Sequence, residues 1–186
     1  MKEQDNLLDI LRKTVAAMKR EDVIEMRRLS NRTIHSASIY YDTDNIAAAV
    51  MIYALSKLLE REKYQGYGSW NQFIEKCIMR LEEAIDAVEA DDTEMFRHAV
   101  TGIKEEVNAL SDHLKDYIED VFRKASVNKA SRIYEHGISM QQTAEMLGIS
   151  VFELAEYAGR TGIADVGLSI TKDVKERVKI AEEILS

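Results

Sequence analysis

Four polar side chains near the start of the chain are spaced so that they could act together on a phosphate group. They are Arg28, Asn31, Arg32 and His35. The last three follow Arg28 by three, four and seven residues, which places all four side chains on one face of a helix. Guanidinium groups hold phosphate in a fork, and histidine is the usual acid or base near neutral pH. The group suits attack by an RNA 2′-hydroxyl on its own phosphate, with Asn31 and Arg32 as nucleic-acid contacts.

Two less specific interpretations fit the same four residues. They could form an ordinary solvated basic face of a helix, with His35 near the turn that follows. They could also form a surface that binds phosphate or a protein partner without any chemistry. The residue types alone leave all three interpretations open.

The stretch NRTIHSASIYYD, residues 31–42, resembles the HEPN family of helical-bundle nucleases and toxins. The motif of that family is an arginine followed, after four to six residues, by a histidine, and six residues separate Arg28 from His35. The resemblance implies a ribonuclease that needs no metal, with Arg28 and His35 as catalytic residues. Leu29 departs from the pattern because a polar residue is common after the arginine, and the motif falls early in the bundle rather than late.

A second stretch, ISMQQTAEMLGISVFELAEYAG at residues 138–159, resembles the helix-turn-helix family. Ala144 supplies the small residue that the pattern needs where the two helices cross. Gly148 falls in the turn, where a positive φ is easiest without a Cβ. Ser139 and Ser150 precede the two helices and are natural N-caps.

The helix-turn-helix resemblance implies that the second helix, residues 150–159, enters the DNA major groove. The contacting positions would be Ser150, Val151, Ala155, Glu156 and Gly159, with Arg160 at the end. The first five cannot make the bidentate contact to guanine that arginine makes, and acidic side chains near phosphates are unfavourable. Docking of a protein partner, or dimerisation, is therefore as good an interpretation of this unit as DNA binding.

The run IAAAVMIYAL, residues 46–55, is the only stretch of ten apolar residues in the chain. Its alanines favour a helix, and a helix that is apolar on every side belongs at the centre of a domain. Helices at residues 5–18 and 22–40 should precede this central helix. We expect Thr43 or Asp44 to cap it and charged residues to end it near residue 63.

A heptad-like spacing then predicts a long antiparallel hairpin. Apolar residues recur every three or four positions in two runs, from Trp70 to Val88 and from Phe96 to Val121. Ser69 and Gln72 have the spacing of a capping box at the start of the first helix. A short acidic turn joins the two helices, and the second would contain about 32 residues, roughly 48 Å. We expect this hairpin to serve bundle packing or dimerisation.

The composition predicts an almost purely helical chain, because its 186 residues include no proline and only eight glycines. The net charge of −8 argues against nucleic-acid binding by the whole surface. The charge is uneven, since residues 12–35 carry a surplus of basic side chains and residues 82–120 a surplus of acidic ones. A single cysteine, Cys77, is expected to be a buried thiol.

The sequence therefore predicts an all-α protein with a helical bundle at residues 1–124. A helix-turn-helix unit and a C-terminal helix that begins near Thr171 would occupy residues 125–186. We expect a cytoplasmic regulatory binding protein that forms a homodimer and has DNA or a protein as its partner. Under the nuclease alternative the partner is RNA. No metal or cofactor pattern and no membrane segment is present in the sequence.

Overall fold

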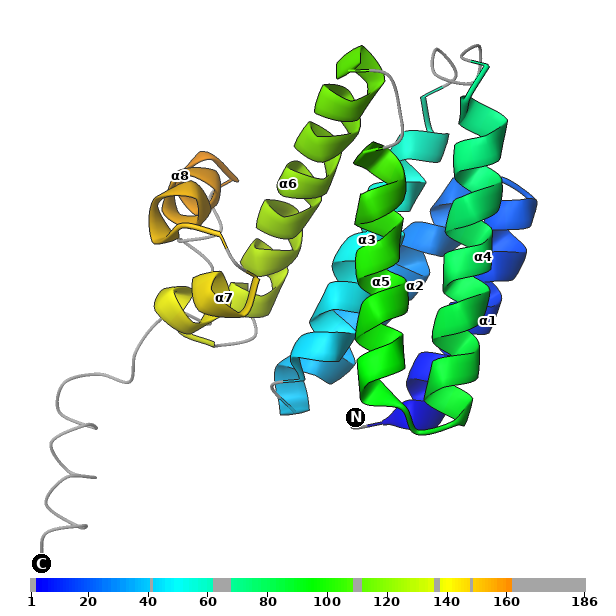
Figure 1. Cartoon of the computed structure of the whole chain (residues 1–186). Helices are drawn as coiled ribbons and strands as arrows, with labels where there is room; N and C mark the ends of the chain where they lie inside the picture. The colour runs from blue at the N-terminus through cyan, green and yellow to red at the C-terminus, as the bar shows by residue number, and fades with distance from the viewer. Residues whose placement is uncertain are drawn as a thin grey trace, which may run out of the picture.

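The computed structural model describes residues 3–40, 42–61, 68–108, 112–135, 138–147 and 149–161, and every regular element in these ranges is an α-helix (Figure 1). In chain order the helices are α1 (Gln4–Lys19), α2 (Val23–Tyr40), α3 (Thr43–Leu59), α4 (Trp70–Glu89), α5 (Thr93–Asn108), α6 (Asp112–Glu135), α7 (Met140–Leu147) and α8 (Val151–Thr161). The all-α class and the helical bundle are confirmed. The C-terminal helix predicted from Thr171 lies outside the described residues, as does Gly148.

The predicted central helix is α3, which is buried along most of its length. Asp42 caps its N-terminus, since one carboxylate oxygen accepts hydrogen bonds from the backbone N–H groups of Asp44 and Asn45 at 3.0 and 3.3 Å. The prediction that Thr43 or Asp44 would be the cap is therefore wrong by one or two residues. The early cap lets the apolar run begin within the first turn of the helix.

Small side chains bring α2 and α3 close together. The inner face of α2 buries Met26, Ser30 and Thr33. The Ser30 hydroxyl donates a hydrogen bond of 2.7 Å to the backbone carbonyl of Ala49 on α3. A larger residue at either position would separate the two backbones, so the alanine-rich sequence of α3 serves this contact.

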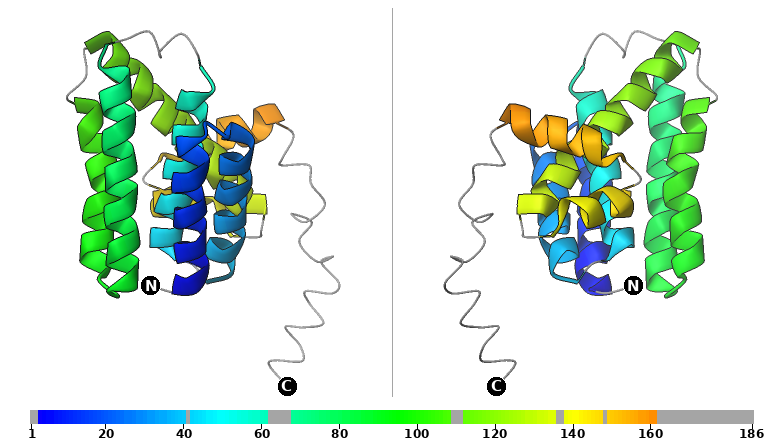
Figure 2. Two further views of the ribbon diagram at one scale, coloured as in Figure 1. Left: turned by 90° about the vertical axis from the view of Figure 1, so that its right-hand side faces the viewer. Right: turned by 90° about the vertical axis from the view of Figure 1, so that its left-hand side faces the viewer.

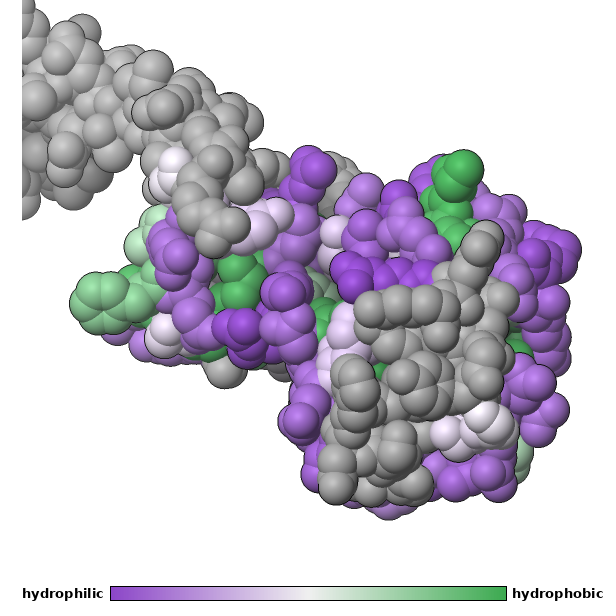
Figure 3. All heavy atoms as spheres, turned by 90° about the horizontal axis from the view of Figure 1, so that it is seen from above, coloured by the Kyte–Doolittle hydropathy of each residue, from purple (hydrophilic) through white to green (hydrophobic). Residues whose placement is uncertain are grey.

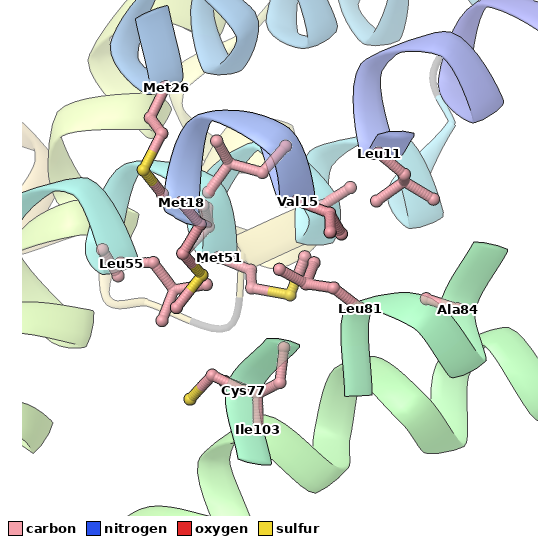
Figure 4. Packing of buried hydrophobic residues seen from close by; sticks show 14 of the residues in the cluster. Leu11, Val15, Met18, Met26, Met51, Leu55, Cys77, Leu81, Ala84 and Ile103 are labelled. Atoms are coloured by element: carbon pink, nitrogen blue, oxygen red, sulfur yellow. The ribbon is translucent and has the colours of Figure 1, made fainter. Parts of the chain in front are cut away.

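Side chains from six helices, α1 to α6, form the main core, and part of this core is shown in Figure 4. Met18 of α1, Met51 of α3 and Leu81 of α4 lie together there, and flexible methionines fill irregular gaps between helices. Cys77 is fully buried next to this group, as the sequence predicts. Burial raises the pKa of the Cys77 thiol well above its ordinary value, so the thiol stays protonated.

α4 and α5 form the predicted antiparallel hairpin, and a tight turn with Asp91 in the left-handed region joins them (Figure 2). The apolar spacing of α4 faces the core, which buries Trp70, Phe73, Cys77, Leu81, Ala84, Ala87 and Val88. Helix α4 begins at Trp70 as predicted. The predicted capping box is wrong, however, because the Ser69 side chain makes no capping hydrogen bond.

The second helix of the hairpin is shorter than predicted, because α5 ends at Asn108 and the next described helix begins at Asp112. In Figure 1, α6 begins near the end of α5 and runs back across the bundle instead of continuing along α4. The 20 residues of α4 span about 30 Å. A straight helix of 32 residues would extend past that surface with its apolar stripe uncovered. The reversal lets Ile118, Val121 and Phe122 join the main core.

Gly102 lies inside α5, and the helix continues through it. A Cβ at this position would lie 2.8 Å from Nε of Arg80, so the glycine makes room for that guanidinium. Arg80 in turn pairs with Glu83 and Glu106 at 2.9 and 3.3 Å. The glycine is thus a packing requirement between α4 and α5 and not a bend.

Helix α6 joins the bundle to the α7–α8 unit, which lies at the end of the molecule away from α1 and α4 (Figure 1). Ala130 of α6 forms a small core with Ala144 and Leu154. Leu147 packs against this core and against the main one. The division at residues 124 and 125 stays a prediction, and α6 crosses that point without a break.

Candidate functional site

The polar stripe of α2 consists of Arg28, Asn31, Arg32 and His35. Its described side chains, those of Arg28, Asn31 and Arg32, contact different partners. Arg28 is exposed and donates two hydrogen bonds to Glu25 of the same helix, at 2.7 and 2.6 Å. These hydrogen bonds hold the pKa of Glu25 below its ordinary value. The charge of Arg28 is therefore balanced within its own helix.

Arg32 extends toward α1. Its guanidinium donates to Oδ1 of Asn6 at 3.1 and 2.6 Å and to Asp9 at 2.7 Å. Hydrogen bonds from Lys13 and then from Arg32 lower the pKa of Asp9. His35 belongs to α2, but its side chain is outside the described part of the structure. The catalytic role predicted for His35 under the nuclease alternative stays a prediction.

Asn31 accepts a hydrogen bond of 2.8 Å from Nζ of Lys129 on α6. Only 1% of the Lys129 surface is exposed, which is rare for a lysine. The same Nζ lies 4.2 Å from the centroid of the Tyr53 ring on α3. Burial, with a smaller contribution from Arg132, lowers the pKa of Lys129 to about 7. The local sequence does not indicate this burial, because Lys129 lies among polar and small residues just after the predicted end of the bundle at residue 124.

Serine caps begin both helices of the α7–α8 unit, as predicted. The Ser139 hydroxyl accepts from the Gln142 N–H at 3.2 Å, and the Ser150 hydroxyl accepts from the Glu153 N–H at 3.1 Å. Glu153 returns the contact by accepting the Ser150 N–H at 3.1 Å, which completes a capping box. The hydrogen bonds from Ser150, and a weaker one from Arg123 of α6, lower the pKa of Glu153.

The helices of this unit meet where the sequence predicts a small residue. Ala144 is buried against α6 and α8, and its carbonyl accepts a hydrogen bond of 3.1 Å from the Ile149 N–H beyond the turn. Thr143 occupies a position where an apolar residue is more common in helix-turn-helix units. Thr143 is fully buried, and among the described residues its hydroxyl has no hydrogen-bond partner.

The outer face of α8 carries an apolar surface. Phe152 is 88% exposed and Val151 is 44% exposed. The other predicted contact positions, Ser150, Ala155, Glu156 and Gly159, are exposed as well. The Arg160 side chain lies outside the described part of the structure. In the view from above, most of the described surface is hydrophilic, with hydrophobic areas in separate places (Figure 3).

Sequence analysis missed Phe152, although its spacing held the signal. A helical turn contains 3.6 residues, so Phe152 falls between Ala155 and Glu156 around the axis of α8, on the same outer face. The helix-turn-helix pattern drew attention to the neighbouring positions instead.

A cleft of about 510 Å³ between α3, α6 and α8 was also missed. Its lining includes tyrosines from all three helices, which are Tyr53, Tyr117 and Tyr157. Sequence analysis of each helix alone could find the polar stripes but not the arrangement that brings them together.

Within the described ranges, no cluster of three or more His, Cys, Asp or Glu side chains is placed to hold a metal ion. None of the described helices combines the length and the apolar character that crossing a membrane requires. Comparison of the chain with protein-family models, with curated proteins and with solved structures finds no match. The arguments about function therefore rest on the geometry of the chain itself.

Proposed function

We propose that this chain is a regulatory binding protein that acts through protein–protein contacts. In this proposal the α7–α8 unit is a helix-turn-helix used for docking, and the outer face of α8 is the contact surface. The observation that carries the proposal is Phe152, a large aromatic side chain that is 88% exposed beside the exposed Val151 and Ala155. Exposed aromatic residues on an apolar patch are typical of protein interfaces.

The charge of the unit favours a protein over DNA. Residues 138–161 contain three glutamates and one arginine, a net charge of −2. Phosphate contacts from basic side chains supply most of the affinity of DNA-binding proteins. Glu156 lies on the exposed face of α8, where a recognition helix would meet the phosphates. DNA binding is therefore the less supported use of this surface.

The occupant that fits this surface is a second copy of the chain. A twofold contact needs a self-complementary patch, and α8 presents a protruding side chain, Phe152, next to the small residues Ala155 and Gly159. Nothing lies within 4 Å of where a Cβ on Gly159 would be. A glycine inside a helix costs about 1 kcal/mol relative to alanine, so packing within one chain gives no reason for it. Close approach of a helix from a second copy would give a reason for the glycine at this position.

The ribonuclease alternative has less support. Both described guanidiniums of the α2 stripe are engaged, Arg28 by Glu25 and Arg32 by Asp9. An RNA phosphate would have to displace these carboxylates. No contact of the described residues favours this alternative over a solvated basic face.

Sedimentation of the purified chain tests the proposal. We expect a dimer, and we expect Phe152→Glu to shift the chain to a monomer while its helix content stays the same, because the side chain is exposed. Ile24→Glu is the matched control, since Ile24 is 80% exposed on α2 and far from α8 in sequence. A monomeric native chain, or equal effects of the two substitutions, would contradict the proposal. Duplex DNA binding that Phe152→Glu leaves intact would favour the DNA alternative.

A further inference from the structure

The cleft between α3, α6 and α8 has the size of a small-molecule site. Its volume is about 510 Å³, within the range of roughly 300–1,000 Å³ that is usual for ligand pockets. Thirteen residues line it, which are Tyr53, Lys57, Arg61, Tyr117, Val121, Arg123, Lys124, Ala125, Val127, Asn128, Glu153, Glu156 and Tyr157. They form three walls, one from each helix.

The α3 wall consists of Tyr53 and Lys57, and Arg61 lies just beyond the C-terminus of this helix. Lys57 pairs with Glu60 at 2.9 Å and lies 5.7 Å from the centroid of the Tyr53 ring. Arg61 lies 5.2 Å from the centroid of the Tyr117 ring on α6, and among the described residues it has no carboxylate partner. Arg61 is thus the cation of the cleft that is most available to an anionic ligand.

The α6 wall adds two further cations. Arg123 pairs with Asp120 at 3.0 Å and with Glu153 of α8 at 3.3 Å, and Lys124 pairs with Asp120 at 2.5 Å. The lining as a whole contains four cations and two glutamates. Carboxylates already pair with Lys57, Arg123 and Lys124, so the positive charge that can attract an anion is chiefly that of Arg61.

The remaining lining supplies flat and apolar surface. Tyr117 of α6 and Tyr157 of α8 both line the cleft, and the Tyr157 hydroxyl accepts a hydrogen bond of 2.9 Å from Nδ2 of Asn128. Val121 and Ala125 lie between the polar groups on α6. An inorganic anion would leave this surface uncovered and most of the volume empty.

We propose that the cleft binds a small organic anion with a planar apolar body, held at its charged end by Arg61 and Lys57. The ring of the ligand lies against the tyrosines and the apolar side chains of α6. Glu153 and Glu156 on the α8 wall disfavour a second negative charge at the other end of the ligand. The cleft shares Glu156 with the exposed face of α8, but Phe152, Ala155 and Gly159 do not line it, so this proposal does not rest on the proposed dimer.

Three ligands that share one ring test the charge preference. Indole-3-acetate is an anion, indole-3-acetamide is its neutral analogue, and tryptamine is a cation. Titration calorimetry of the full chain should show saturable binding of indole-3-acetate that is about tenfold tighter than that of the amide, a difference of about 1.4 kcal/mol. Tryptamine should bind more weakly than either. Absence of saturable indole-3-acetate binding, or equal affinity for all three ligands, would overturn the proposal.

Two substitutions locate the site. Arg61→Gln should weaken indole-3-acetate binding about tenfold, which equals roughly 1.4 kcal/mol, and leave the amide unaffected. Arg20→Gln is the matched control, because Arg20 is exposed at the turn between α1 and α2 and is not part of the cleft. An equal effect of the two substitutions would place the anion elsewhere and reject the assignment. Both side chains are exposed, so neither change should unfold the chain.

Discussion

The main bundle and the α7–α8 unit differ in the size of the core that each of them buries. The core of the bundle contains large side chains from six helices, including Phe96, Met51 and Leu55. The core of the α7–α8 unit consists of Ala130, Ala144 and Leu154, with partly buried neighbours around them. The bundle places most of its large apolar residues inside, with Ile24, Met79 and Met95 as exposed exceptions, while the small unit leaves Phe152 outside.

This difference distinguishes the bundle, which has a large core, from the α7–α8 unit, which has a small core and an exposed apolar surface. The small unit depends on its neighbours, since Leu147 packs against the main core as well as its own. An exposed phenylalanine contributes nothing to such a unit unless something covers it. The comparison supports the proposal that the α8 face is a contact surface and the bundle its support.

Loss of a core side chain in the bundle should have the largest effect. Leu55 is fully buried at the centre of α3, so Leu55→Ala should lower the free energy of unfolding of the whole chain by about 3–5 kcal/mol. Urea denaturation followed by circular dichroism measures this change. A loss below about 1 kcal/mol would show that α3 is not the centre of the core.

Lys129 should make stability depend on pH at the junction of the two regions. Its pKa is about 7 in the folded chain against an ordinary value of 10.5, so between these pH values only the unfolded chain holds the proton. The free energy of unfolding should therefore rise from pH 7 toward pH 10, by about 1.4 kcal/mol for each pH unit. Below pH 7 the ammonium is charged in both states, and the free-energy cost of burying this charge in the folded chain is fully present.

Replacement of the lysine separates this effect from other titrations. Lys129→Met should remove the rise in stability above pH 7, and Lys124→Met, at an exposed position on the same helix, should keep it. Urea denaturation of both variants at pH 6 and pH 9 measures the difference. The same pH slope in Lys129→Met as in the native chain would show that Lys129 is not its source.

Loss of the central leucine of the small unit should have a smaller and local effect. Leu154 is fully buried between α6 and α7, and Leu154→Ala should destabilise the unit by about 2–3 kcal/mol. Hydrogen exchange should become faster in α7 and α8 and stay the same in α1 and α4. Equal acceleration in all four helices would mean that the chain unfolds as one unit and would remove the distinction drawn above.

Substitution of Thr143 should cause the smallest change in stability, and this change should be a stabilisation. Its buried hydroxyl has no hydrogen-bond partner among the described residues, so Thr143→Val should stabilise the unit by about 1 kcal/mol. The exchange rates of the α7 amide protons report on this change. A destabilised variant would indicate that the hydroxyl has a partner in solution.

Much of the fold could be predicted because the local signals agree with the packing. The apolar run at residues 46–55 lies in the buried central helix, and the serines at positions 139 and 150 cap their helices. The end of α5 could not be predicted, because the apolar spacing continues through Leu110 and Leu114. Only the length of α4, which is a tertiary partner, limits how far α5 can run beside it.

The candidate sites were less predictable than the fold. The spacing of Arg28, Asn31 and Arg32 placed them correctly on one helix face, but their partners lie on α2, α6 and α1, which spacing does not reveal. The cleft required three helices to meet, so only single stripes such as that of Lys57 and Arg61 were visible in the sequence. The exposed face of α8 could have been predicted from the sequence, since a helical wheel places Phe152 on it.

A cross-link through α8 tests the central claim of this account most directly. Ala155 is exposed in the middle of the proposed twofold contact, so Ala155→Cys should form a disulfide between two copies under mild oxidation. Ala16→Cys, at an exposed position on α1, is the control and should form no disulfide between copies under the same conditions. The native Cys77 is buried and should not react. A cross-linked dimer from Ala155→Cys alone is the expected result, and equal cross-linking of both variants, or none, would contradict the proposed contact.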